Sequence, residues 1–482
     1  MKQRITKVSL IFLLAAIVHA DDVPAFKRHV IQVPSTSLDW LWPYWHDINK
    51  DGLTDLLAVV HRQGKVFFYV QNASGFPPVA GQSLDLPEGT AWCTVCDVNK
   101  HPGDEILIST ANGLAYYRQS DGVFEKQPQT LLEAKQVFVS QTTPTVFDLI
   151  TQEEDLKSAI PLIFADHTVL YELGENYQFR PAKRIELEFK KTIEKDVFNS
   201  WSLGSRKSEQ IRIRTIAQAK SEDREQKEPT KENEYIREVL EKTKDKELQG
   251  CFVQEQDVNK DGNKDTILLH LQQDIGVRTN VIIFYRRKDH TLPEKPDQIL
   301  RCRGMPIMGD YPRPSYCSAF FDINNDGFLD IVLMELKTIP TSAGDLMEIL
   351  ASKGMTWTLT VRVFKQPEGF SNRADFRMDF RTMLPVSESF EDVINLEGDF
   401  NADGRNDLIV RRSPTESDIY LSSVRTGFFE SQPKLQLEVP ADARTSVEDL
   451  NDDGVSDIYL LDYEKGRITV FLSKTSNSKG PS

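Results

Sequence analysis

Oxygen-bearing side chains recur along this sequence in one nine-residue pattern, Asp-x-Asn-x-Asp-Gly-x-x-Asp. The clearest copy runs from Asp322 to Asp330 and lies between Phe320-Phe321 and the apolar run that begins at Ile331. Oxygens at positions 1, 3, 5 and 9 suit a hard cation, which prefers many oxygen ligands, and Gly at position 6 permits a tight turn. The pattern therefore predicts a loop that binds a divalent metal ion.

Five complete copies of the pattern supply the predicted ligands, and the carbonyl at position 7 would complete each set. The predicted ligand residues are Asp47, Asn49, Asp51 and Asp55; Asp257, Asn259, Asp261 and Asp265; Asp322, Asn324, Asp326 and Asp330; Asp399, Asn401, Asp403 and Asp407; and Asp449, Asn451, Asp453 and Asp457. A sixth copy, Asp97 to Glu105, has His101 in place of the middle Asp, followed by Pro102. We expect about five calcium sites, because flexible oxygen ligands without a substrate phosphate favour calcium over magnesium.

EF-hand and dockerin-like loops share part of this pattern but need a different residue at position 12. An EF-hand has a bidentate Glu there and flanking helices, and a dockerin-like loop also has an acid there. Position 12 is apolar in all five copies, namely Ala58, Leu268, Leu333, Val410 and Leu460. An Asp/Asn/Gly turn that holds itself together without metal stays open as an alternative. Five equivalent copies favour an ion, because clustered carboxylates repel one another when no cation is present.

The spacing of the copies predicts the fold. Successive copies begin 50 residues apart at Asp47 and Asp97, and again at Asp399 and Asp449, while two longer intervals follow Asp257. Each copy is followed by short apolar and alternating runs, so a unit has about four strands, which is typical of β-propeller blades. The predicted units begin at Asp47, Asp97, Asp148, Asp257, Asp322, Asp399 and Asp449. We therefore expect an all-β chain that forms a seven-bladed β-propeller over residues 21–474.

The two ends of the chain are expected to close this ring. The last unit lacks an outer strand, and the alternating run from Phe26 to Val33 precedes the first unit as an orphan strand. Pairing the two would remove exposed sheet edges. Residues 206–250 are dense in charge and predicted to be an insertion, partly helical over Glu234 to Leu248, and residues 475–482 a disordered tail. Two alternatives stay open for residues 206–250, a partner-binding helix and an eighth blade. A second, shorter insertion is expected at Pro340 to Gly354.

The first twenty residues predict export. Lys2, Arg4 and Lys7 precede an apolar run from Val8 to Val18, and small residues follow, as in a secretory signal peptide of residues 1–20. The run is too short to predict a membrane span, and no other stretch is long enough, so we expect no membrane insertion. The formal net charge of −15 argues against nucleic acid as a partner. A secreted, extracellular or periplasmic location is expected, with surface association open.

The five cysteines leave at least one unpaired in an exported protein. Cys302 and Cys317 are the pair that we expect to form a disulfide, because both lie near predicted strands on either side of one connection. Cys93 and Cys96 have the spacing of a redox motif, but they precede a metal-type loop rather than open a helix. A structural role is therefore predicted for them.

The repeated loops resemble the FG-GAP and VCBS repeat family, the β-propeller modules of integrin α-chains and of many exported bacterial proteins. The resemblance spans roughly Phe26 to Ser473 and rests on the five complete loops. It implies that each loop joins the first and second strands of a blade and binds calcium through positions 1, 3, 5 and 9. It also implies that the loops share one rim, opposite the face at which ligands dock. The loop with His101-Pro102 and the unit at Asp148 depart from the pattern.

Three functions follow from these expectations. The first is a secreted or cell-surface interaction module that binds an extracellular protein or a glycan. The second is a carbohydrate-active enzyme similar to a polysaccharide lyase, since some lyases use related propellers. Against it, the histidines form no recognisable pair with a nucleophile in the sequence. The third is a scaffold whose working part is the insertion at residues 206–250.

Overall fold

The structure is a computed structural model of the chain. It describes residues 24–35, 41–90, 92–101, 103–120, 122–135, 145–146, 159–163, 167–173, 177–186, 251–274, 276–308, 317–337, 354–383, 393–423, 427–441 and 443–474. The predicted signal peptide, the insertion at residues 206–250, the helix expected near Asp345, Asp148 and the tail all lie outside the described residues.

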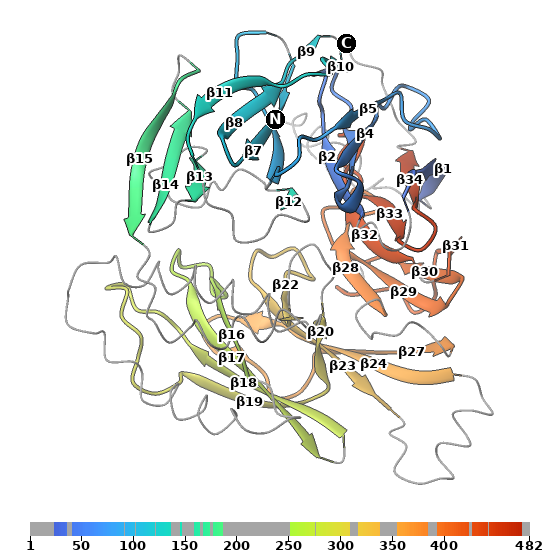
Figure 1. Ribbon diagram of the computed structural model, residues 1–482. Helices are drawn as coiled ribbons and strands as arrows, with labels where there is room; N and C mark the ends of the chain where they lie inside the picture. Colours follow the sequence, from blue (N-terminus) through green and yellow to red (C-terminus); the bar gives the residue numbers. More distant parts are fainter. Residues whose placement is uncertain are drawn as a thin grey trace, which may run out of the picture. The chain divides into compact units, whose positions relative to one another are not determined.

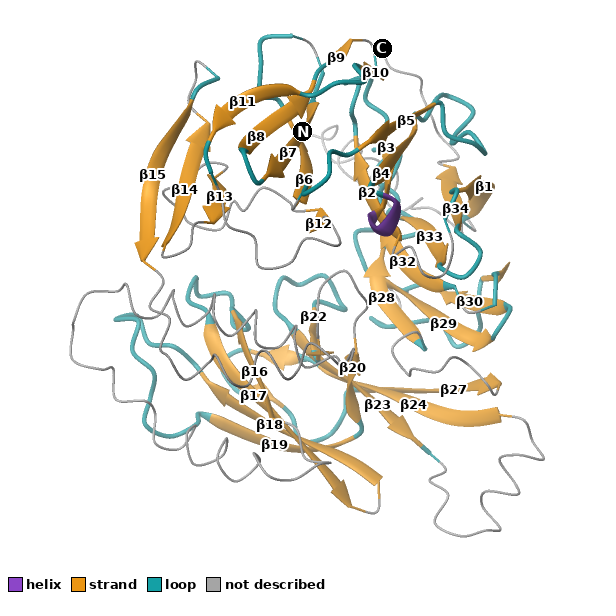
Figure 2. Cartoon of the chain, in the orientation of Figure 1, coloured by secondary structure: helices purple, strands orange, loops and turns teal. Residues whose placement is uncertain are grey.

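The described chain is all-β, as the sequence predicted. It contains strands β1 to β34 and, within the described residues, one short helix, the 3-10 turn η1 at His61–Gln63 (Figure 2). No helix in the described ranges has the length and apolar character that a membrane span requires. The strands form seven sheets of three or more strands, together with two small two-stranded ribbons.

Two compact units make up the chain. The first is formed mainly by residues 233–462, and the second mainly by residues 30–232. Each contains several sheets whose neighbouring strands are antiparallel and follow one another in sequence, with few exceptions (Figure 1). This simple order arises because short connections join adjacent strands more readily than distant ones.

The second unit holds three sheets. One has the order β2-β3-β4-β5, made of Leu41–His46, Asp55–Val60, Lys65–Tyr69 and Gln82–Asp85. The next has the order β11-β8-β7-β6-β12, made of Gln129–Glu133, Gly113–Tyr117, Glu105–Thr110, Trp92–Cys96 and Thr145–Val146, and β9 (Gln119–Ser120) and β10 (Val123–Phe124) form a ribbon. The third comprises β13 (Ala159–Ile163), β14 (His167–Leu173) and β15 (Phe179–Glu186).

The first unit contains three complete sheets. The order β16-β17-β18-β19 joins Cys251–Gln256, Asp265–Asp274, Gly276–Phe284 and Gln298–Arg303. The next sheet contains β20 (Met305–Met308), β21 (Cys317–Ser318), β22 (Phe320–Phe321), β23 (Asp330–Leu336), β24 (Gly354–Arg362) and β27 (Phe376–Met383), and β25 (Phe364–Lys365) pairs with β26 (Gly369–Phe370). The order β28-β29-β30-β31 joins Ile394–Gly398, Asp407–Ser413, Glu416–Tyr420 and Leu435–Glu438.

The remaining sheet brings together the two ends of the described chain. Its order is β1-β34-β33-β32, made of Ala25–Gln32, Arg467–Lys474, Asp457–Asp462 and Arg444–Glu448. The opening strand is thus the outer neighbour of the last one, which is the pairing that the sequence predicted for Phe26 to Val33.

The burial of each strand follows its place in its sheet. The second strands β3 and β33 are buried at every residue, whereas the edge strand β27 alternates between exposed and buried residues. Strands covered on both faces are continuously apolar, while an edge strand buries one face only. In the first unit, Trp357 and Val410 share one core cluster, so the sheets containing β24 and β29 pack face to face.

Two observations differ from the sequence-based expectations. Cys302 is a free, buried thiol, so the predicted Cys302–Cys317 disulfide is wrong. The reason is that β19 directs Cys302 into the apolar core beside Leu300, whereas Cys317 lies on β21, a strand of another sheet. In addition, the strand that precedes Asp148 is β12, which pairs in parallel with β6 rather than with β13 of the third sheet.

Candidate metal centre

Each complete loop connects the two strands of an antiparallel hairpin. In all five, the position-9 Asp pairs with the residue just before position 1, as Asp55 does with His46 and Asp330 with Phe321. The same register occurs at Gln256↔Asp265, Gly398↔Asp407 and Glu448↔Asp457. Flanking strands exclude the EF-hand, which needs helices on both sides of its loop.

The side chains at positions 1, 3 and 5 are oriented by the backbone of their own loop. In the copy at Asp322, the amide of Asp326 donates to Asp322 Oδ1 and to Asn324 Oδ1, both at 3.1 Å. Gly327 N donates to Asp322 Oδ2 at 2.8 Å, and Phe328 N donates to Asp326 Oδ1 at 2.9 Å. The other four complete loops make the same four bonds. In every complete loop, the position-5 amide therefore draws together the oxygens of positions 1 and 3, and the position-7 amide holds the position-5 carboxylate.

Two backbone positions make this conformation possible. Position 4 lies in the left-handed region in each complete loop, at Lys50 (φ 59°), Lys260 (56°), Asn325 (55°), Ala402 (57°) and Asp452 (53°). The position-6 glycines also have positive φ, for example 87° at Gly52 and 85° at Gly327. A side chain is strained at these angles, which explains why Gly recurs at position 6.

The position-9 carboxylates have a role that the sequence did not predict. Asp330 is fully buried; its Oδ2 accepts from Ile323 N at 3.2 Å and its Oδ1 from Phe364 N at 3.1 Å. The equivalent Asp residues likewise accept from the position-2 amide and from an amide at or two residues beyond the end of the third strand of the sheet. Position 9 thus fastens the loop hairpin to the third strand.

Burial shifts the pKa of these carboxyl groups upward. Desolvation raises the pKa of Asp55 and Asp265 to about 6, of Asp330 and Asp457 to about 7, and of Asp407 to about 8, although the backbone amides oppose the shift. The carboxylates at positions 1 and 5 add to the effect by like-charge repulsion. A cation placed among these oxygens would relieve that repulsion.

The loop from Asp97 to Glu105 has a different conformation. Of the four bonds that the complete loops share, this loop keeps one among the described residues, from His101 N to Asn99 Oδ1 at 2.7 Å. Its position-4 residue, Lys100, does not have a positive φ. Glu105 is fully buried and its Oε2 accepts from Val98 N at 3.1 Å, but its Oε1 has no hydrogen-bond partner. The enclosed Asp97 Oδ1 is also without a partner.

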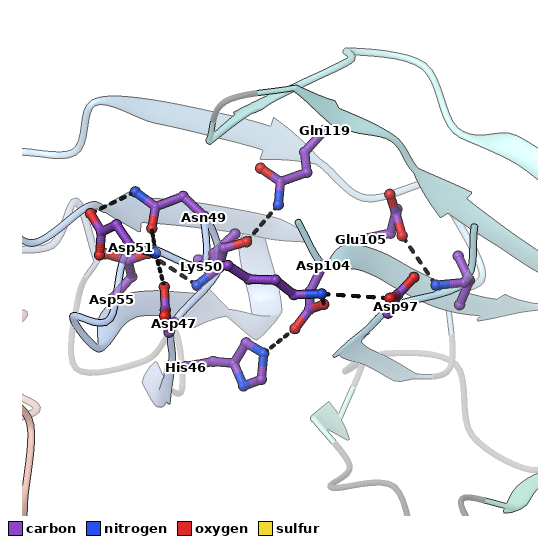
Figure 3. A network of polar contacts seen from close by, with 12 residues as sticks. His46, Asp47, Asn49, Lys50, Asp51, Asp55, Asp97, Asp104, Glu105 and Gln119 are labelled. Carbon is purple, nitrogen blue, oxygen red and sulfur yellow. Dashed lines mark hydrogen bonds and ion pairs between the residues drawn. The ribbon is translucent and has the colours of Figure 1, made fainter. Parts of the chain in front are cut away.

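A basic side chain from the preceding loop enters this altered loop. Lys50 Nζ lies 2.8 Å from Asp104 Oδ1 and 3.5 Å from Asp97 Oδ2 (Figure 3). His46 Nε2 lies 2.5 Å from Asp104 Oδ2, so one carboxylate has two nitrogen partners. The hydrogen bond to Asp104 raises the pKa of Lys50. Desolvation alone would raise the pKa of Asp104, but the hydrogen bonds from His46 and Lys50 outweigh it and lower that pKa. The sequence did not reveal the His46–Asp104 pair, because its members are far apart in the chain.

Neighbouring loops within a unit also touch through their backbones. The position-8 amide of Asp104 donates to Ile48 O at 3.2 Å, and that of Leu329 donates to Val258 O at 3.3 Å. Ser456 N likewise donates to Asp399 O at 2.8 Å, and Asp399 N donates to Ser456 Oγ at 3.0 Å. Each loop is therefore positioned partly by the one before or after it.

The donor set fits a hard cation in its chemistry. Positions 1, 3 and 5 carry carboxylate and amide oxygens, and in each complete loop the oxygens of positions 1 and 3 accept from the same position-5 amide. In the described residues, no group of three or more His, Cys, Asp or Glu side chains is arranged to hold a metal ion. In each complete loop, position 3 is Asn, and the carboxylate at position 9 accepts hydrogen bonds from backbone amides. The same hydrogen bonds would also hold a turn without metal, so the predicted calcium ligands stay a prediction.

The cysteine pair Cys93 and Cys96 and a small cavity beside Cys93 lie in the apolar core of the second unit. Burial raises the pKa of the Cys93 thiol to about 12 and that of Cys96 above its usual range, which disfavours the reactive thiolate. A cavity of about 10 Å³ beside Cys93 and Tyr44 has room for no more than a water molecule.

Comparisons with known proteins identify no family for this chain. No family model matches it, and no curated protein matches it. Two crystal structures of BBS1N in complex with ARL6DN, soaked with mercury or with lead, are similar to this chain with 8% and 9% sequence identity, and each has a TM-score of 0.33. Each alignment covers 95% of this chain and 99% of the matched chain. An Agrocybe aegerita lectin that recognises non-reducing terminal N-acetylglucosamine is 12% identical, with a TM-score of 0.29 and coverage of 89% and 86%.

Proposed function

We propose that this protein is an exported, calcium-stabilised β-propeller of seven blades that acts as a binding module for an extracellular protein or a glycan. One observation carries the proposal: five loops, in five sheets, present the same oxygens in the same hydrogen-bonded conformation. A turn that occurred by chance would not repeat its register, its left-handed position 4 and its buried position 9.

The seven sheets support the propeller part of the proposal. Each would be one blade, with the position-9 Asp fastening its first hairpin to its third strand. The pairing of β1 with β34 would place the first strand of the chain in the last blade and so join the two ends of the ring.

Calcium acts here as a structural ion. Each loop would hold it through the carboxylates at positions 1 and 5, the amide oxygen at position 3 and the carbonyl at position 7. The ion would offset the repulsion between the two carboxylates, and the loop would then hold its hairpin in register. Such a site supplies stability rather than catalysis, since closed metal sites leave no position for a substrate.

The binding role rests on the organisation of the chain. Neighbouring loops within a unit are hydrogen-bonded in pairs, so each pair can present side chains to a partner together. The strands beneath them are buried and supply a rigid base. Rigid scaffolds that carry adjacent loops are typical of protein- and glycan-binding modules.

Chelation tests the calcium proposal. We expect the melting temperature of the full mature chain to fall by about 10 °C or more when excess chelator replaces calcium, since several ions bind only the folded state. Calorimetric titration of the metal-free protein with calcium should show about five ions bound. Identical melting curves in calcium and in chelator would refute the proposal. Magnesium at equal concentration serves as the control and should restore less of the lost stability.

Affinity capture tests the binding role. The mature protein, immobilised in calcium and in chelator, is exposed to a glycan array and to the soluble proteins of its own extracellular environment. We expect a protein or a glycan to be retained in calcium and released with chelator, because the loops lose their conformation. Release of shortened, unsaturated oligosaccharides from a polyuronate would instead assign a lyase. Equal retention with and without calcium would show that binding of the ligand does not depend on calcium in the loops.

A further inference from the structure

The loop of residues 97–105 presents a problem that the five complete loops do not have. It keeps the position-1 carboxylate, Asp97, and an acid at position 9, Glu105, but His101 and Pro102 replace the residues that orient them. In the complete loops, position 1 accepts two backbone amides; in this loop, Asp97 Oδ1 has no hydrogen-bond partner. Asp104 at position 8 adds a third carboxyl group nearby. Buried or half-buried carboxylates this close require a counter-charge.

Lys50 brings that charge from the preceding loop. It occupies position 4, at φ 59°, and its side chain points toward the next loop. Its ammonium group lies 2.8 Å from Asp104, which is 11% exposed, and 3.5 Å from Asp97. Figure 3 shows the Lys50 side chain extended between these two carboxylates. A lysine ammonium is a compact point charge with three donors, so it can satisfy both.

The equivalent lysine of another loop makes a useful contrast. Lys260 also occupies position 4, at φ 56°, and its side chain also reaches the next loop, where it lies against Gly327. That next loop is complete, and Asp322 and Asp326 are bonded by their own backbone amides. No ion pair of Lys260 occurs among the described residues. The two lysines therefore share a position and a direction but differ in what they meet.

We propose that Lys50 is the built-in cation of the loop of residues 97–105: its ammonium group supplies the positive charge that a divalent ion supplies in the complete loops, so this loop closes without metal. The proposal deepens the proposed function and, in its comparison with calcium, rests on it. On this proposal, Lys50 is the residue that keeps the loop of residues 97–105 from taking an ion. The contact between this loop and the loop of residues 47–55 is then independent of calcium in the loop of residues 97–105.

The first test uses the full mature chain in excess chelator, so that it does not depend on whether any loop binds calcium. Lys50→Met should lower the melting temperature by about 1–3 °C more than the control Lys260→Met, since only Lys50 neutralises carboxylates. Asp97→Asn should lower it less in the Lys50→Met background than in the wild-type background, because the two residues act as a pair. Equal shifts for the two lysine variants, with additive effects of Asp97→Asn, would overturn the proposal.

The second test restores the loop. His101→Asp with Pro102→Gly restores positions 5 and 6 of the pattern and keeps Glu105 at position 9. Calcium alone is titrated into this variant with and without Lys50→Met. We expect one additional calcium ion, bound at least about tenfold more tightly when Lys50 is replaced, because the ammonium group repels a divalent ion at short range. Equal affinity in the two backgrounds would contradict the proposal. If no loop of the wild-type protein binds calcium, the proposed function fails, while the first test still decides the role of Lys50.

Discussion

The loops of residues 47–55 and 97–105 belong to neighbouring sheets and share one hairpin register, yet they are held together differently. In the first, backbone amides of the loop itself donate to the side chains of Asp47, Asn49 and Asp51. In the second, Lys50 and His46 from outside the loop bind the carboxylate of Asp104. The difference teaches that the register of the hairpin and the means of neutralising its acids are separate properties. The loop that carries His101-Pro102 keeps the register and differs in how its acids are neutralised.

The largest expected contrast concerns position 9. Asp55 accepts two backbone amides, from Ile48 and Gln71, whereas Glu105 accepts one, from Val98. Asp55→Ala should therefore cost about 3–5 kcal/mol of the free energy of unfolding and Glu105→Ala about 1–2 kcal/mol, because each lost bond leaves a buried amide unpaired. Urea denaturation in chelator measures both. Equal losses would show that position 9 does not fasten the third strand.

A smaller effect is expected at position 6. Gly52 has φ 87° and open space around it, so Gly52→Ala should cost about 1 kcal/mol through backbone strain alone. Gly81 also has open space but no positive φ, and Gly81→Ala should be neutral or slightly stabilising. Thermal unfolding of the two variants compares them directly. A neutral Gly52→Ala would mean that the loop can adopt another conformation at no cost.

The smallest effect should change sign between the two kinds of loop. Ala402 occupies position 4 of a complete loop at φ 57°, so Ala402→Gly should stabilise the protein by about 0.5 kcal/mol as the strain is relieved. Lys100 occupies position 4 of the altered loop without positive φ, so Lys100→Gly should destabilise it by about 0.5–1 kcal/mol. Differential scanning calorimetry resolves the two signs. The same sign for both would remove the conformational distinction between the loops.

Much of the fold could be predicted because it depends on local pattern. The position-12 residues, such as Leu333, are apolar and lie in strands, so the hairpin context of each loop followed from the sequence alone. The pairing of the opening strand with the last one also followed, since a unit without an outer strand needs a partner. The Cys302–Cys317 pairing failed because spacing along the chain does not reveal which face of a strand a cysteine occupies.

The role of position 9 was only half predicted. Its acid type was recognised, but one of its backbone partners lies in the loop itself and the other lies at or just beyond the end of the third strand; for Asp330 they are Ile323 and Phe364. The sequence carries no signal for the second partner. A hint could have come from its sequence context, because Asp330 directly precedes the apolar run Ile331-Val332-Leu333, which predicts a carboxylate at the start of a buried segment. A buried acid needs hydrogen-bond donors, and the nearest are backbone amides.

The sequence by itself determined the all-β class, the place of each loop between two strands and the set of oxygens that each loop presents, since these depend on residue types a few positions apart. Only the tertiary structure decided that Lys50 reaches Asp97 and Asp104, and that His46 shares Asp104. These contacts join residues about 50 positions apart, and they arise because neighbouring hairpins bring their loops together. Local chemistry can therefore be derived from spacing, whereas the counter-charge of the altered loop comes from packing.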